Sequence, residues 1–291
     1  MSEVTIAIIG GSGLYHMDGL TDVSERTVET PYGPPSDDIV VGTLHGRRVA
    51  FLPRHGRGHR INPSHVPYRA NIYALKTLGV ERIVSVNAVG SLREEITPMD
   101  IVIPEQLIDR TRHRPDTFFE DGIVAHIAFA EPFCPEMRRV LATAAADSGA
   151  RVYDGGTYIA MEGPQFSTRA ESLLYRSWGA HIIGMTVIPE AKLAREAEIC
   201  YGVVAFVTDY DCWHPGHDSV TTEVIFRNLL KGVDTARAIL SHVVESMPAD
   251  RSCGCGSALS DAIVTAANLV PAETAQRLAP IAGRYLGKVT Q

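Results

Sequence analysis

Two aspartates one residue apart, Asp209 and Asp211, are the side chains best placed to do chemistry in this sequence. They follow residues 201–207, an apolar, β-rich run that predicts a buried parallel strand. Open α/β sheets bind ligands beyond the carboxyl ends of such strands. A carboxylate beside Trp213, partly shielded from water, would have a raised pKa and could protonate a heterocycle. The alternative is that both aspartates solvate a loop while Trp213 caps the core, and these residues alone favour neither interpretation.

Groups that can bind an anion follow several other expected strands, over residues 4–9, 47–52, 82–86 and 181–185. They are Ser12, Arg54, His55, Asn87, Ala88 and Thr186. If the strands are parallel, these positions meet the two aspartates at one edge of the sheet. Hydroxyls, a guanidinium, an imidazole and backbone N–H groups are typical of a phosphate site. Because the net charge is -7, an anion must be held by such a local site.

Strands and helices alternate along the chain. Apolar residues at helical spacing predict helices over 66–78, 135–148, 188–200 and 221–246, and a capping box at 168–171 opens another. This order predicts one α/β domain with a mostly parallel sheet over residues 1–246. Residues 247–291 are expected to form a linker and a helical tail of the same domain. The polar stretch 109–121 is expected to be a surface loop.

Composition excludes several classes of protein. Dispersed basic residues leave no patch for nucleic acid or an anionic membrane surface. The chain starts without the pattern of a signal peptide, and no apolar run reaches the roughly 20 residues of a membrane helix. We therefore expect a cytoplasmic protein.

Motifs for metals and nucleotides are incomplete. The third glycine of a dinucleotide loop would fall at His16, and a P-loop pattern is missing. Five cysteines do not form a secreted disulfide framework. Cys253 and Cys255 lie too close in sequence for the usual zinc knuckle, so no metal site is expected. A local disulfide between them and two reduced thiols both remain open.

Ordered segments along residues 4–245 resemble the trimeric purine nucleoside phosphorylases closely, and within them the branch that uses 5'-methylthioadenosine. These segments are 10–14, 53–57, 71–76, 90–95, 108–111, 130–135, 162–167, 185–190 and 208–213. The resemblance implies a single α/β domain whose mixed sheet forms a distorted barrel flanked by helices. It implies a homotrimer, and a hexamer built as a dimer of trimers stays open.

The resemblance also implies a reaction. Methylthioadenosine and phosphate would give adenine and methylthioribose 1-phosphate in purine and methionine salvage, with no metal or organic cofactor and with phosphate as co-substrate. Adenosine as a second substrate stays open. The alternative within the family is a broader purine nucleoside phosphorylase that accepts inosine and guanosine. Outside it, a nucleoside hydrolase and a non-catalytic nucleoside binder are the rival interpretations.

Site residues carry over position by position. The phosphate ligands would be the six anion-binding residues named above. The nucleoside contacts would be Met185 under the sugar, Phe166 against the base, Asp209 and Asp211 at the base edge, and His126 from a neighbouring subunit at the 5' end. Specificity would involve Ser167, Thr222 and Ile225.

Some positions depart from the family pattern. Ser12 and Asn87 stand where threonine is frequent, and both keep a polar group. Thr222 and Ile225 match two valines at the methylthio group. The Thr222 hydroxyl would make the 5' pocket more polar. Alternatively, this hydroxyl bonds the backbone of its own helix and the pocket is little changed. The Cys253–Cys255 tail resembles that of some archaeal members, in which such cysteines form disulfides.

The expected mechanism is acid catalysis. Breaking the glycosidic bond puts positive charge on the ribose and negative charge on the purine. Asp209 would protonate N7 and accept a hydrogen bond from the 6-amino group, and Asp211 would set its protonation. Because a 6-oxo purine accepts at that position, an aspartate there selects adenine.

Overall fold

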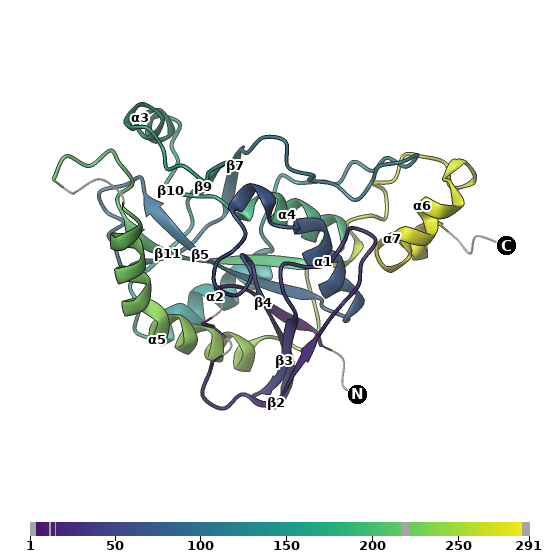
Figure 1. Cartoon of the computed structure of the whole chain (residues 1–291), viewed down its shortest axis with the longest axis horizontal. Helices are drawn as coiled ribbons and strands as arrows, with labels where there is room; N and C mark the ends of the chain where they lie inside the picture. Colours follow the sequence, from purple (N-terminus) through teal and green to yellow (C-terminus); the bar gives the residue numbers. More distant parts are fainter. Residues whose placement is uncertain (1–3, 12, 15, 217–220, 287–291) are drawn as a thin grey trace.

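The computed structural model describes residues 4–11, 13–14, 16–216 and 221–286. Eleven strands form one sheet in the order β2-β3-β4-β1-β5-β10-β9-β7, with β11 beside β5, β6 beside β11 and β8 beside β6 (Figure 1). The strands are β1 (Ile6–Gly10), β2 (Thr21–Arg26), β3 (Ile39–Leu44), β4 (Arg47–Pro53), β5 (Arg82–Ser91), β6 (Ile101–Ile103), β7 (Gln106–Arg110), β8 (Val152–Asp154), β9 (Thr157–Met161), β10 (Ile182–Gly184) and β11 (Cys200–Asp209). Both parallel and antiparallel pairings occur, so the sheet is mixed, as expected.

The sheet is open, and the barrel expectation needs correction in that respect. Strands β2, β7 and β8 are ends of the pairing order among the described residues. The cause lies in β5, which pairs with β1 through Arg82–Ser85 and with β10 only at Gly90 and Ser91. Its other edge stays paired with β11 throughout. The sheet therefore forks along β5 and does not close.

Helices cover both faces of the central strands. They are α1 (Tyr68–Thr77), α2 (Pro135–Asp147), α3 (Arg169–Ser177), α4 (Val187–Glu196), α5 (Thr222–Ser246), α6 (Ala272–Arg277) and α7 (Ala279–Leu286), with short 3-10 turns η1 (Pro63–His65), η2 (Gly254–Ser257) and η3 (Ala267–Leu269). Helix α4 packs on β11 and α1, and α2 packs on β11 and α5. Along β11, Val203 and Val207 join the core under α1 and α4, whereas Val204 and Phe206 join the core under α2 and α5. Burial on both faces explains why this strand reads as a continuous apolar run.

Several element boundaries differ from the expected ones. The strand predicted over 82–86 runs on to Ser91, so it contains Asn87 and Ala88. Gly155 and Gly156, whose φ angles are 117° and 85°, separate β8 from β9. The helix predicted over 188–200 ends at Glu196, and Cys200 already belongs to β11.

The stretch 109–121 is not the surface loop that its polarity predicted. Its first residues belong to β7, and Arg114, Phe118 and Phe119 are buried. The Arg114 guanidinium donates to the backbone carbonyls of Met185 and Ile188, which explains how a charged side chain is accommodated there.

Residues beyond α5 pack on the domain. Leu259, Leu278 and Ile281 belong to the same apolar cluster as Leu75 of α1. The Tyr73 hydroxyl donates to the backbone carbonyl of Arg277, which is the last residue of α6. Among the described residues, none of the helices combines the length and the apolar character needed to cross a membrane.

Candidate active site

Arg54, directly after β4, is buried beneath the fork of the sheet. Its Nε and Nη2 donate to the carboxylate of Glu190 on α4. Nη2 also donates to Ser85 Oγ at 2.6 Å, and Nη1 donates to the Val86 carbonyl at 3.0 Å. Burial alone would lower the pKa of Arg54, but the Glu190 carboxylate raises it above the usual value. The guanidinium is therefore charged, fixed in place and electrically balanced.

Asn87 and Thr186 join this arrangement from two other elements. Asn87 Nδ2 donates to Ser85 Oγ at 3.0 Å, and the Thr186 hydroxyl donates to Asn87 Oδ1 at 2.8 Å. Both side chains are buried, whereas Ala88 is exposed in the middle of a central strand. Ala88 is exposed because this edge of β5 is unpaired here. The pairing with β1 ends at Ser85, and the pairing with β10 begins at Gly90.

His55 is held as a neutral imidazole. Its Nδ1 lies 2.8 Å from the Ile61 carbonyl, which can only accept, so Nδ1 carries the proton. The ring stacks on His59 with 4.2 Å between centroids. Burial, followed by the Arg54 charge, lowers the pKa of His55 to about 4. At neutral pH the free Nε2 is therefore an acceptor and adds no positive charge to the site.

A bound phosphate is expected to raise the pKa of His55 above 4, because the anion stabilises the imidazolium and offsets the Arg54 charge. NMR titration of histidine-labelled protein with and without phosphate measures this shift. The His55→Gln variant identifies the signal by its loss, and chloride at equal ionic strength is the control. An unchanged His55 titration at saturating phosphate would contradict contact between the anion and this ring.

Asp209 ends β11 with only 9% of its surface exposed. One carboxylate oxygen accepts from the Thr208 hydroxyl at 2.7 Å and the other from the Asp211 backbone N–H at 2.8 Å. Burial raises the pKa of Asp209 to about 6, against the effect of these two donors, and the Asp211 charge adds to the rise. The alternative that these aspartates merely solvate a loop is thus wrong, since Asp211 is buried as well.

Asp211 and Gly90 complete this end of the site. Asp211 adopts a left-handed backbone with φ of 50°, which aspartate tolerates better than most residues. Burial raises its pKa too. A Cβ on Gly90 would lie 2.9 Å from Asp209 Oδ1 and 3.2 Å from Asp211 Cβ. Glycine at position 90 therefore lets both aspartates lie against β5, about 10 Å along the strand from Asn87.

Trp213 packs in a small core beside these aspartates. It belongs to the apolar cluster that holds Tyr210 and Ile183, its Nε1 donates to the Ser91 carbonyl at 2.8 Å, and Arg176 lies 3.3 Å from its ring centroid. The ring thus holds the chain after β11 against the end of β5.

The loop after β9 brings further predicted residues to the same region. The Ser167 carbonyl accepts from the Cys212 thiol at 3.2 Å, which joins this loop to the aspartates. A Cβ on Gly163 would lie 2.5 Å from Met185 Sδ, so Met185 packs directly on the loop backbone. Phe166 is 40% exposed, which is unusual for a large aromatic side chain.

The four remaining predicted residues are Ser12, Thr222, Ile225 and His126. Ser12 lies outside the described residues, as does the side chain of Thr222 in the first turn of α5. Ile225 is half-buried in that turn. His126 is exposed, and its backbone N–H donates to the Ala262 carbonyl beside the bridge between Ala125 and Ile263. Within one chain, His126 does not join the other site residues.

Three supporting residues were missed at the level of sequence. Glu190 is fully buried in the apolar first half of α4, and a lone acid in such a run was the available signal. Ser85 bridges Arg54 and Asn87 from within an apolar strand. Asn228 Nδ2 donates to the Thr208 carbonyl and ties α5 to the end of β11, without any local signal in its sequence.

We call Arg54 with its partners Glu190, Ser85 and Asn87 the Arg54 cradle. This cradle and the buried pair of aspartates both lie beside β5 of an open sheet. The arrangement is consistent with a phosphorolytic enzyme. The sequence profile of the Phosphorylase superfamily matches residues 5–245, and the chain belongs to this family. It is 58% identical over 285 residues to the S-methyl-5'-thioadenosine phosphorylase of Geobacter sulfurreducens, covering 98% of this chain and 100% of the relative. The Koribacter versatilis enzyme of the same name is 57% identical, with 98% of both chains covered.

Solved structures agree with this assignment. A methylthioadenosine phosphorylase from an Antarctic soil metagenomic library superposes with a TM-score of 0.93 at 52% identity, covering 97% of this chain and 99% of that one. The Schistosoma mansoni methylthioadenosine phosphorylase in complex with adenine gives a TM-score of 0.81 at 38% identity, covering 86% and 93%.

Proposed function

We propose that this chain catalyses the phosphorolysis of S-methyl-5'-thioadenosine to adenine and 5-methylthioribose 1-phosphate, as a pentosyltransferase of purine and methionine salvage. One observation carries the proposal: a carboxyl group with a pKa of about 6 lies against the same strand as the Arg54 cradle. Relatives more than half identical to this chain carry the name of this activity. The broader inosine and guanosine activity is disfavoured because Asp209 stands where a 6-oxo purine would need a donor.

The phosphate would bind along the open edge of β5. Arg54 Nη1 and Asn87 Nδ2 each use one N–H within the protein and have a second one to donate. The Thr186 hydroxyl would turn from Asn87 to the anion, and Ser12, the Ala88 backbone and His55 would complete the site. Because Glu190 already balances Arg54, directed hydrogen bonds rather than net charge would provide much of the affinity.

The base would lie over Gly90 and against Asp209. Protonated Asp209 would donate to N7 as the glycosidic bond breaks and its electron pair moves onto the purine. The second carboxyl oxygen would accept from the 6-amino group, while Asp211 orients Asp209 through its backbone N–H. Phosphate would then form the new bond to C1' from the opposite face. We propose that no metal or organic cofactor takes part at this centre.

The sugar and its 5' substituent would contact the remaining predicted residues. Met185 would lie under the ribose, Phe166 against the base, Ser167 beside the aspartates at the base edge, and Thr222 and Ile225 around the 5' end. The position of His126, remote from these residues in one chain, fits a role at the site of a neighbouring subunit. This supports assembly of several chains. We propose a homotrimer, with a hexamer of two trimers as a further assembly, and a cytoplasmic location.

Base release from methylthioadenosine, adenosine and inosine, with and without phosphate, tests the proposal. We expect adenine release only with phosphate, and a rate on inosine lower by a factor of up to about 10⁴. Release without phosphate would indicate a hydrolase, and tight binding without turnover a nucleoside binder. Equal rates on inosine and methylthioadenosine would favour the broader phosphorylase.

A further inference from the structure

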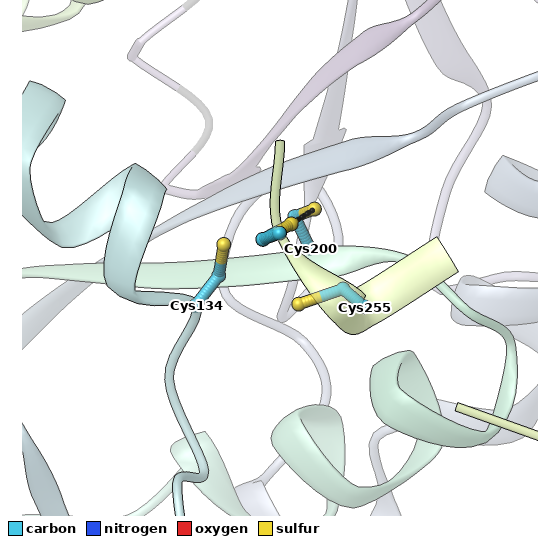
Figure 2. A group of neighbouring side chains, drawn as sticks. Cys134, Cys200 and Cys255 are labelled. Atoms are coloured by element: carbon cyan, nitrogen blue, oxygen red, sulfur yellow. Dashed lines mark hydrogen bonds between the residues drawn. The ribbon is translucent and has the colours of Figure 1, made fainter. Parts of the chain in front are cut away.

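Four of the five cysteines gather at one point, remote in sequence from one another. Cys134 precedes α2, Cys200 begins β11, and Cys253 and Cys255 flank the start of η2. Their four sulfur atoms all lie within 4.8 Å of one another. Figure 2 shows Cys134, Cys200 and Cys255 side by side, each from a different element. The short spacing of Cys253 and Cys255 argued against a metal, but the other two cysteines come from distant segments.

This cysteine cluster is largely buried and lies at the start of α2. Cys134, Cys200 and Cys255 are at most 2% exposed, and Cys253 is partly exposed. Cys134 is the residue directly before the first turn of α2. Negative charge at this position faces the positive end of α2.

A cavity of about 280 Å³ leads to the cluster. Cys253, Gly254 and Cys255 line it, together with Arg195 and Glu131. The cavity provides a path for a small ion, and the arginine partly offsets the net negative charge of a metal with four thiolates.

We propose that Cys134, Cys200, Cys253 and Cys255 bind one zinc ion in a tetrahedral structural site. With Zn–S bonds of about 2.3 Å, the sulfurs of such a site lie about 3.8 Å apart. Cys200 and Cys253 are 3.3 Å apart and would separate by about 0.5 Å, whereas the widest pair would close by about 1 Å. Binding releases the protons of the four thiols and needs no oxidant. Closed four-sulfur coordination excludes a catalytic role for the ion.

Two disulfides are the competing arrangement of the same sulfurs. A disulfide brings two sulfurs to about 2.05 Å and leaves each pair independent of the other. Here every sulfur is near the other three, which is the requirement of a single shared ion. The zinc site would fasten residues 253–255 to α2 and to the first residue of β11, whose far end carries Asp209.

Metal analysis of the full-length protein, purified without chelator from zinc-supplemented cells, tests the site. We expect about one zinc per chain by plasma mass spectrometry. Under denaturing conditions without reductant, alkylation should modify all five cysteines once zinc is removed. Cys253→Ser and Cys255→Ser should each lose most of the zinc, whereas Cys212→Ser, which changes the cysteine outside the cluster, should retain it.

Cobalt provides a readout that does not depend on any variant. Wild-type protein stripped of zinc and loaded with Co²⁺ alone should show the visible absorption of a tetrahedral thiolate complex. Less than about a tenth of a zinc per chain, or a mass before reduction that reveals two disulfides, would overturn the proposal. Neither measurement involves turnover, so its result is independent of the proposed phosphorolysis.

Discussion

Asp209→Asn is expected to lower kcat/KM for methylthioadenosine by about 10²–10⁴-fold, the usual contribution of a general acid. The amide keeps the size of the side chain but cannot give up a proton to N7, and its NH₂ group opposes the 6-amino donor. Steady-state rates from pH 5 to 9 measure the effect. The wild-type profile should fall above pH 6, since the protonated form is active and the pKa of Asp209 is about 6; the variant should lack this fall.

The same variant is expected to be more stable than wild type at pH 8. The pKa of Asp209 is about 6 in the folded chain against 3.8 for an unperturbed carboxyl, so folding becomes less favourable as pH rises from 3.8 to 6. Above pH 6 the full penalty applies, at most about 3 kcal/mol. Asp234→Asn, the same change at an exposed position, is the control for both measurements. Unchanged turnover in Asp209→Asn would rule out the proton-donor role.

Glu190→Gln is expected to destabilise the chain by about 3–5 kcal/mol, because it leaves the Arg54 guanidinium buried without its counter-charge. The side chains of this pair are 4% and 0% exposed. Glu190 also accepts from Ser85 and Tyr201, and an amide cannot satisfy all of these donors. Urea unfolding at fixed protein concentration measures the loss. Phosphate affinity should weaken as well, since Arg54 loses its fixed orientation.

Glu25→Gln provides the matched control for this prediction. Its partner is Arg57, and the two side chains are 53% and 39% exposed. Exposed pairs of this kind contribute about 0–1 kcal/mol. If Glu190→Gln cost no more than Glu25→Gln, the buried pair would not be what holds the Arg54 cradle in place.

Features set by local pattern were predictable. The apolar run before Asp209 identified a buried strand, and the capping box at Thr168 and Glu171 forms as expected. A glycine-free amphipathic pattern likewise identified α1 and α2, because helical contacts are close in sequence.

Features that depend on residues distant in the sequence were not predictable. Asn87 and Ala88 look like residues after a strand, since polar and small side chains interrupt the apolar run. They remain in β5 because β11 continues to pair with it, and no local signal reports a neighbour more than a hundred residues away. Glu190 and Ser85 were missed for the same reason: their role depends on Arg54, which approaches them only in the folded chain.

The cysteine cluster illustrates the same limit. Spacing rules apply to ligands from one segment, and they correctly described Cys253 and Cys255 as a poor pair by themselves. Cys134 lies at the start of α2 and Cys200 at the start of β11. These two positions are distant in the sequence and meet only in the folded chain.

The fork of β5 has a consequence for how substrate range can change. Asn87 and Gly90 belong to one continuous strand, so in the proposed binding mode three residue steps of β5 would separate the phosphate from the base. An insertion there would turn every following side chain to the opposite face. The first turn of α5 is outside the sheet, so changes of length before it would leave the register of β5 intact. In this binding mode β5 would fix the distance between the phosphate and the base, and we expect substrate range to vary at the 5' end.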